Sequence, residues 1–262
     1  MSTIFAHAPL KLAPGQTALI GPETDAPLPA QLILSGVPTP VQAGTCLGPD
    51  AEHPWLQING ALWLPGKPHA RHGAVVRALS ACSFTATPQT IRMWRKDFSL
   101  AWITMSDKGS RGERSDASGP LIPELVASVL TLNLVQGFLL PDSRSGLKSL
   151  LAFLALEQRF DVIVTSGGTG VAPRDISPEV TAWIVEKRLP GFEQAMMSNS
   201  LTKTPHAMIS RAAAGILGTS LIINLPGSPK GARENLEALL PALKHTLDKI
   251  HNDPADCGVE DL

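Results

Sequence analysis

One segment decides the fold of the C-terminal part of this 262-residue chain: Asp161-Val162-Ile163-Val164-Thr165-Ser166-Gly167-Gly168-Thr169-Gly170. The apolar, β-branched run after its first residue is typical of a strand that is covered on both faces. The glycines that follow can make tight turns and let the backbone approach a ligand closely. Because ligands of open α/β sheets bind at the carboxyl ends of the strands, the segment predicts such a sheet with a binding loop at its edge.

The same pattern extends to both sides of this segment. From Leu100 onward, apolar runs alternate with stretches that have apolar residues at helical spacing, which predicts a parallel sheet with helices on both faces. We expect strands at 100–105, 134–140, 161–165 and 220–224. We expect helices at 118–131 with Ser118 as the N-cap, at 143–158, 178–187 and 191–200, and a single long helix from the turn at 225–230 to about residue 250.

The first hundred residues have a different composition. Frequent prolines between Pro9 and Pro88 exclude long helices, so the short apolar runs between them predict strands. Asn59-Gly60 stands between two such runs and predicts a hairpin turn. The polar stretch Thr85–Asp97 predicts a linker. We therefore expect a small β-rich domain at 1–97, including this linker, and an α/β domain with three layers at 98–262.

Composition excludes several classes of protein. The net charge is −1 and no run of lysine or arginine is present, which argues against a nucleic-acid or membrane-surface partner. No apolar run is long enough to span a bilayer. Three cysteines are too few for a disulfide framework, so we expect a cytoplasmic protein. Cys46, Cys82 and the histidines near them do not have the spacing of a zinc site.

Polar residues follow each of the first two strands of the α/β domain. The loop Ser106–Gly119 is rich in serine and glycine and can offer backbone N–H groups to an anion. Asp142 follows the second strand, where it can hold Mg²⁺ or a ribose, or serve only as a helix cap.

The ends of the other two strands are also rich in special residues. Gly167–Gly170 can form a nest of N–H groups for an anion, and Asp175 beyond it is suited to a metal ion that bridges phosphates. The spacing is neither Gly-x-Gly-x-x-Gly nor that of a P-loop. Ser228 and Lys230 follow the last strand and can bind an anion, or form a structural turn before a helix that begins at proline.

Together these segments resemble the MogA/MoaB-type molybdopterin adenylyltransferase family, which also supplies the first domain of gephyrin. The resemblance covers about residues 100–250 and does not extend to the first hundred. The loop Gly168-Thr169-Gly170 and the turn Gly227-Ser228-Pro229 favour this branch over the related molybdenum-inserting proteins. The matching stretches are Ser106–Arg114, Ser118-Gly119-Pro120, Pro141-Asp142, Ser166–Gly170 with Pro173-Arg174-Asp175, Ser177-Pro178-Glu179, Pro190-Gly191, Ser200-Leu201 with Thr204–Arg211, and Asn224–Lys230.

The resemblance implies an activity and a set of site residues. The activity is adenylylation of molybdopterin by ATP with Mg²⁺ and release of pyrophosphate, in a homotrimer that has the molybdenum-inserting enzyme as a further partner. Asp142 and Asp175 are implied as catalytic residues and metal ligands. Ser143 departs from the family, which often has Glu there, and Ser115 departs from a common acidic pair. The residues implied to bind molybdopterin or the nucleotide are Ser110, Gly112, Ser166, Gly167, Gly168, Thr169, Gly170, Ser200, Pro226, Gly227, Ser228 and Lys230.

Other functions stay open on the sequence. A protein of the same fold could bind molybdopterin without catalysis, and nucleotide turnover would separate the two. The N-terminal domain could serve as a scaffold that recruits another protein of cofactor assembly, which a pull-down with residues 1–97 would test. A pyridine-nucleotide enzyme is disfavoured by the glycine spacing.

Overall fold

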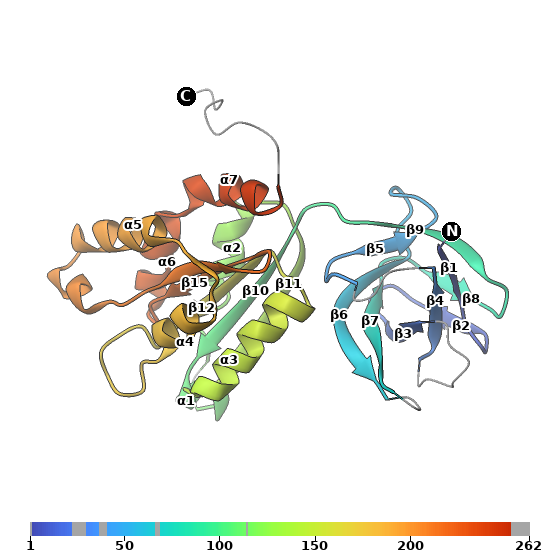
Figure 1. Cartoon of the computed structure of the whole chain (residues 1–262), viewed down its shortest axis with the longest axis horizontal. Helices are drawn as coiled ribbons and strands as arrows, with labels where there is room; N and C mark the ends of the chain where they lie inside the picture. The colour runs from blue at the N-terminus through green and yellow to red at the C-terminus, as the bar shows by residue number, and fades with distance from the viewer. Residues whose placement is uncertain (1, 23–29, 37–40, 66–68, 114, 253–262) are drawn as a thin grey trace, which may run out of the picture. The chain divides into compact units, whose positions relative to one another are not determined.

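The computed structural model describes residues 2–22, 30–36, 41–65, 69–113 and 115–252. The chain divides into two units, Met1–Asp97 and Phe98–Leu262, each with its own hydrophobic core (Figure 1). None of the described helices has the length and apolar character needed to cross a bilayer.

The first unit is a closed β-barrel with the strand order β1-β4-β3-β7-β6-β5-β9, beside a small sheet formed by β2 and β8. Its core consists mainly of aliphatic side chains such as Ile4, Ile58 and Val76, which are fully buried, together with Phe84. The strands are β1 Ser2–Phe5, β2 Leu10–Leu12, β3 Thr17–Pro22, β4 Leu32–Ser35, β5 Cys46–Gly48, β6 Leu56–Leu64, β7 Arg71–Ala78, β8 Cys82–Phe84 and β9 Gln89–Trp94.

The predicted hairpin at Asn59-Gly60 is wrong. Strand β6 runs through both residues, with Ile58 opposite Val76 and Gly60 opposite Val75, so Asn59 is the extra residue of a β-bulge. Residues that tolerate the backbone of a tight turn also suit a bulge, and local sequence does not separate the two.

The predicted linker at 85–97 is also wrong for most of its length. Residues Gln89–Trp94 form β9, which pairs with β1 on one side and with β5 on the other and so closes the barrel. Thr90 and Arg92 are exposed on either side of the buried Ile91, so the sequence of this strand resembles that of a solvated connection.

The second unit contains a sheet with the order β11-β10-β12-β15-β14-β13. Its first four strands are parallel, whereas β14 and β13 are antiparallel, so the mixed α/β fold is confirmed but the sheet is not parallel throughout. Leu217 pairs with Ser220 across a turn at Gly218, whose φ of 58° favours glycine. The strands are β10 Phe98–Met105, β11 Leu132–Leu140, β12 Val162–Ser166, β13 Lys187–Arg188, β14 Ala214–Leu217 and β15 Ser220–Leu225.

Helices connect these strands, and two differ from prediction. The single long helix predicted at the C-terminus is wrong: it breaks before Pro241, because proline has no N–H to continue the preceding hydrogen bonds. Ser118 is not a helix N-cap, because the helix begins only after Pro120. The helices are α1 Asp107–Ser110, α2 Leu121–Ala127, α3 Arg144–Ala152 continued by the π-helix η1 Phe153–Glu157, α4 Ser177–Ile184, α5 Pro190–Leu201, the 3-10 helix η2 Pro205–Ile209, α6 Pro229–Glu237 and α7 Leu240–Ile250.

The helices lie on both faces of this sheet. One core cluster joins α2, α5, α6 and α7 to one set of alternate strand residues, such as Val162 and Val164. The intervening Ile163 and Ile222 are equally buried and point to the opposite face, beside which α3 and α4 lie (Figure 1). The carboxyl ends of β10, β11, β12 and β15 lie at one edge of the sheet, and this edge carries the candidate site.

Candidate functional site

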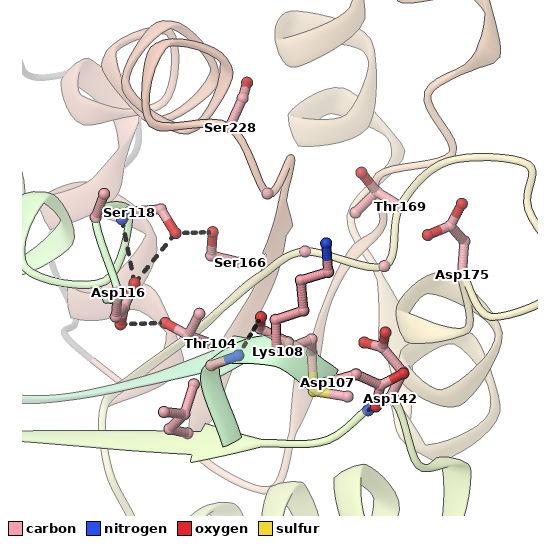
Figure 2. Close-up of a pocket in the computed structure, with 18 of the residues that line it drawn as sticks. Thr104, Asp107, Lys108, Asp116, Ser118, Asp142, Ser166, Thr169, Asp175 and Ser228 are labelled. Carbon is pink, nitrogen blue, oxygen red and sulfur yellow. Dashed lines mark hydrogen bonds between the residues drawn. The ribbon is translucent and has the colours of Figure 1, made fainter. Parts of the chain in front are cut away.

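A cavity of about 490 Å³ lies at the carboxyl ends of the parallel strands (Figure 2). The loops after β10, β11, β12 and β15 all contribute to it, because parallel neighbours end at the same edge. The predicted site residues that line it are Asp142, Ser166, Gly167, Gly168, Thr169, Gly170, Asp175, Gly227 and Ser228.

The glycine loop after β12 is held in a conformation that glycine alone adopts readily. Gly167 and Gly168 have φ values of 104° and 68°, and a Cβ on Gly167 would lie 2.7 Å from the carbonyl oxygen of Met105. Ser177 fixes the loop from behind: its hydroxyl donates to the Gly167 carbonyl at 2.8 Å, and its N–H donates to the Gly168 carbonyl at 3.1 Å.

The N–H groups of this loop are available to a ligand. Among the described residues, none accepts a hydrogen bond from the backbone N–H of Gly168, Thr169 or Gly170. Successive unpartnered N–H groups beside positive-φ glycines form an anion-binding nest. The loop can therefore receive a phosphate group through its backbone.

A hydrogen-bonded network around Asp116 forms one wall of the cavity (Figure 2). Its carboxylate accepts from Thr104 Oγ1 at 2.6 Å, and from the N–H groups of Ser118 and Gly119 at 3.1 and 2.8 Å. The Ser118 hydroxyl lies 3.0 Å from the hydroxyl of Ser166, which is also 3.2 Å from the Pro226 carbonyl. The network therefore joins the loops after β10, β12 and β15.

Carboxylates gather on another side of the cavity. Asp107 accepts a hydrogen bond at 3.0 Å from the N–H of Asp142, and Asp175 follows the glycine loop (Figure 2). Burial raises the pKa of Asp142 above its ordinary value, and the charges of Asp107 and Asp175 raise it further, whereas Arg174 lowers it. Lys108 extends its ammonium group into the space between these carboxylates and the glycine loop (Figure 2).

This side of the cavity suits a magnesium ion that arrives with its ligand. Among the residues that the structure describes, no group of three or more acidic, histidine or cysteine side chains is close enough to hold a metal ion alone. Mg²⁺ commonly uses only one or two carboxylates and completes its shell with water and substrate phosphates. The like charges that raise the pKa of Asp142 are the environment that a cation would relieve.

Five predicted site residues are absent from the cavity lining: Ser110, Gly112, Ser200, Pro226 and Lys230. Ser110 donates to the carbonyl of Asp107 at 3.0 Å, and Gly112 makes a turn with φ of 74°. Pro226 takes part through its carbonyl, which accepts from Ser166.

The last two of these residues, Ser200 and Lys230, have partners outside the cavity. Ser200 accepts a hydrogen bond at 2.9 Å from the side chain of Asn235. Lys230 lies 3.9 Å from Glu234 and lines a second hollow of about 420 Å³, together with Lys203 and Arg233. Of the five predicted residues that are absent from the main cavity, only Lys230 lines this second hollow, and Ser200 lines neither.

Other cavity residues were not among the predicted ones: Thr104, Asp107, Lys108, Asp116 and Ser118. The sequence places them in or beside a polar loop after a strand. It does not indicate which residues of that loop turn inward, because the contact between Asp116 and Thr104 depends on the folded strand. Only their position after a buried strand could have indicated them.

The fold and the cavity define a class of protein: an α/β protein with a polar cavity at the ends of its parallel strands, where such folds bind their ligands. Residues 101–245 match the family described as a probable molybdopterin binding domain. The chain therefore belongs to the molybdopterin-binding domain family.

Similar proteins are found in bacteria and in eukaryotes. The chain is 43% identical over 150 residues to the molybdopterin adenylyltransferase of Helicobacter pylori. The aligned region covers 56% of this chain and 85% of that relative. Gephyrin of Dictyostelium discoideum is 37% identical over 161 residues, or 58% of this chain and 22% of gephyrin. The first relationship makes the chain an enzyme of the nucleotidyltransferase type.

Solved structures show the same fold. The molybdopterin biosynthesis enzyme MoaB of Thermus thermophilus has a TM-score of 0.55 and 43% identity, over 61% of this chain and 99% of that one. The tungsten cofactor synthesizing protein MoaB of Pyrococcus furiosus has a TM-score of 0.53 and 33% identity, over 61% of this chain and all of that one. The family match begins at residue 101 and thus lies within the second unit.

Proposed function

We propose that the second unit catalyses the Mg-ATP-dependent adenylylation of molybdopterin and releases pyrophosphate. The observation that carries the proposal is the cavity itself, in which an unpartnered glycine-loop nest faces Asp142 and Asp175. The relatives named molybdopterin adenylyltransferase support the choice of reaction.

In the proposed reaction, the terminal phosphate of molybdopterin attacks the α-phosphorus of ATP. A new phosphorus–oxygen bond forms, the bond from the α-phosphorus to the bridging oxygen breaks, and pyrophosphate leaves. Such transfers depend on positioning and on charge neutralisation, so no protein nucleophile is needed. The N–H groups of Gly168–Gly170 would bind phosphate oxygens, and Lys108 would offset their charge.

Asp142 and Asp175 would hold Mg²⁺ at this site, together with phosphate oxygens of the nucleotide. The bound ion would neutralise negative charge on the phosphates. Serine at position 143 fits this arrangement, because its hydroxyl accepts from the Gly146 N–H at 3.2 Å and caps α3 behind Asp142. Ser143 thus supports the backbone that presents Asp142 without adding a further carboxylate.

The second substrate would approach from the hollow that contains Lys230. Ser228 lies in the main cavity and Lys230 in the hollow, only two residues further along the same segment. We propose that Ser228, Ser200 and Lys230 bind the anionic groups of molybdopterin across this surface, and that Ser110, Gly112 and Pro226 shape the loops that border it.

The test is a direct assay of the purified chain. With ATP, Mg²⁺ and molybdopterin we expect pyrophosphate and an adenylylated pterin that is identified by its mass. Asp175→Ala should abolish both products while its circular dichroism stays that of the unaltered chain. A folded Asp175→Ala protein with full activity would remove Asp175 from the mechanism, and a wild-type chain that binds molybdopterin without turnover would favour the non-catalytic alternative.

The proposal includes a homotrimer in the cytoplasm that passes its product to the molybdenum-inserting enzyme. These three points come from the family resemblance. Sedimentation at several protein concentrations tests the first: a single species of three chains is expected, and a monomer at all concentrations would contradict it.

A further inference from the structure

We propose that Arg211 is a positioning residue for Asp175: it clamps the loop 169–175 in the conformation that presents the Asp175 carboxylate to the cavity. Arg211 does not line the cavity, and in the sequence it is only the last residue of the matching stretch Thr204–Arg211. The inference rests on the proposed function for its catalytic consequence, but the clamp itself can be tested without any substrate.

Arg211 bonds to both ends of this loop. Its backbone N–H donates to the Thr169 carbonyl at 3.0 Å, and its Nε donates to the Gly170 carbonyl at 2.7 Å. Its Nη2 donates to the Asp175 carbonyl at 2.9 Å. One side chain therefore joins carbonyls that are five residues apart, and it fixes the width of the loop between them.

Glu179 holds the guanidinium in place. It forms an ion pair with Nη1 of Arg211 from the first turn of α4, the helix that follows Asp175. Both side chains are partly exposed, at 36% and 40%. A planar guanidinium can serve the two carbonyls and the carboxylate together because its donors point in fixed directions, whereas a lysine ammonium cannot match them all.

The shape of the loop sets the position of the Asp175 carboxylate. Its Oδ2 accepts from the Ala172 N–H at 2.8 Å, and the Asp175 N–H donates to the Ala172 carbonyl at 2.8 Å. A Cβ on Gly170 would lie 2.7 Å from the same Oδ2, so the carboxylate fits closely against both sides of the loop. Movement of the Gly170 or Asp175 backbone would therefore move the carboxylate.

The first experiment measures the clamp directly by limited trypsin digestion at the Arg174–Asp175 bond, inside the loop. In Arg211→Met we expect cleavage at this bond, followed by mass spectrometry, to be about tenfold faster than in the unaltered chain, as loss of a charged hydrogen bond predicts. Arg211→Lys should be intermediate. The matched control is Arg188→Met, which removes an arginine–glutamate pair of 2.7 Å from the same unit but away from this loop, and it should not change the rate.

The second experiment concerns the metal ion. In Arg211→Met we expect the Mg²⁺ concentration that gives half-maximal pyrophosphate release to rise about tenfold, with much of kcat restored at saturating Mg²⁺, because the carboxylate is displaced rather than lost. Mn²⁺ binding in the presence of ATP, followed by electron paramagnetic resonance, should weaken by a similar factor. If Arg211 only stabilised the fold, Arg211→Met would lower the fraction of folded, active protein. It would not change the Mg²⁺ concentration for half-maximal activity or the Mn²⁺ concentration for half-maximal binding.

The two experiments separate this inference from the proposed function. Unchanged cleavage at Arg174–Asp175 in Arg211→Met would overturn the clamp, and so would an unchanged Mn²⁺ midpoint. A wild-type chain that makes no pyrophosphate, with faster cleavage in Arg211→Met, would refute the adenylylation and leave the clamp standing.

Discussion

An aspartate at each end of the sheet in the second unit can be compared: Asp161 at the amino end and Asp142 at the carboxyl end. They differ in their hydrogen-bond partners and in the charges around them. At the amino end, Asp161 is fully buried and accepts from the N–H and the hydroxyl of Ser99 at 2.6 and 2.8 Å, with His251 Nε2 at 3.1 Å. At the carboxyl end, the carboxylate of Asp142 accepts no hydrogen bond from any residue that the structure describes, and it faces two further aspartates.

This difference in partners distinguishes a carboxylate that stabilises the fold from one that is available to a ligand. A buried carboxylate that accepts two hydrogen bonds and lies beside a histidine stabilises the fold around it. A half-buried carboxylate with further aspartates nearby costs stability, and such sites are typical of places where a ligand supplies the missing partner. The comparison can be tested by removing the two charges and measuring stability and activity separately.

The largest effect is expected from Asp161→Ala. The substitution removes the carboxylate that accepts two hydrogen bonds from buried Ser99, so the free energy of unfolding of the second unit should fall by about 3 kcal/mol. Denaturant titration monitored by circular dichroism measures it. The control is Asp248→Ala, which breaks an i,i+4 pair with Lys244 on the surface of α7 and should cost about 0.5 kcal/mol or less. Equal losses in the two variants would contradict the structural role of Asp161.

The next largest effect is expected from Asp142→Asn, which should lower pyrophosphate release about 100-fold, a typical result of losing one preorganised charge contact. Its stability should change in the opposite direction from that of Asp161→Ala. The pKa of Asp142 is raised in the folded state, mainly by burial, so ionisation destabilises the fold as the pH rises through the window between the ordinary and the raised pKa.

An uncharged asparagine removes that penalty. Asp142→Asn should therefore be at least as stable as the unaltered chain at neutral pH, and the difference should vanish below the ordinary pKa of the carboxyl group. Thermal unfolding at a series of pH values measures this. A variant that is clearly less stable at pH 7 would show that Asp142 is structural after all.

A smaller effect is expected from Gly170→Ala. The new methyl group would lie 2.7 Å from Asp175 Oδ2, so the carboxylate must move and Mg-ATP should bind about tenfold more weakly. Calorimetric titration measures the affinity. Gly191→Ala is the control, because a Cβ there meets nothing within 4 Å and should leave binding unchanged. Equal affinities for Gly170→Ala and the unaltered chain would contradict the close fit of Asp175 in its loop.

The smallest effect is expected from Ser118→Ala, in the wall of the cavity. It removes the partner of the Ser166 hydroxyl, which keeps the Pro226 carbonyl as an acceptor, so the free energy of unfolding should fall by about 1 kcal/mol. Denaturant titration again measures the loss, and Ser128→Ala on α2 should cost less, because its hydroxyl only bonds within its own helix. If Ser118→Ala lowered the free energy of unfolding as much as Asp161→Ala, the two ends of the sheet would not differ in their contribution to stability.

Much of the second unit could be predicted from the sequence, because short runs of apolar residues indicate its parallel strands. The run Val162–Thr165 is apolar throughout, and the glycines after it need positive φ, so the strand and the loop could both be read directly. The antiparallel strands β13 and β14 could not, since the pairing of Lys187 with Ile216 joins residues far apart in the chain. Local pattern gives the elements, and long-range pairing decides the edge of the sheet.

The site divides in the same way. The rim residues that follow strands, such as Asp142 and Asp175, were predicted to lie together and do line one cavity. The sequence does not assign a role to Asp116 or Arg211. Asp116 contacts Thr104, and Arg211 contacts Gly170, only once the chain has folded. Residues that act through their neighbours leave no signal of their own in the sequence.

The closure of the first unit by β9 has a consequence for how the protein behaves in concentrated solution. A closed ring has no strand that is open along the whole of one side, so the barrel is a poorer template for strand addition than the edge of an open sheet. Strand β11, at the end of the other sheet, is such an edge, with Val135 and Leu139 exposed beside it. Self-association through strand addition should therefore begin at β11, and a lysine at position 135 should suppress it.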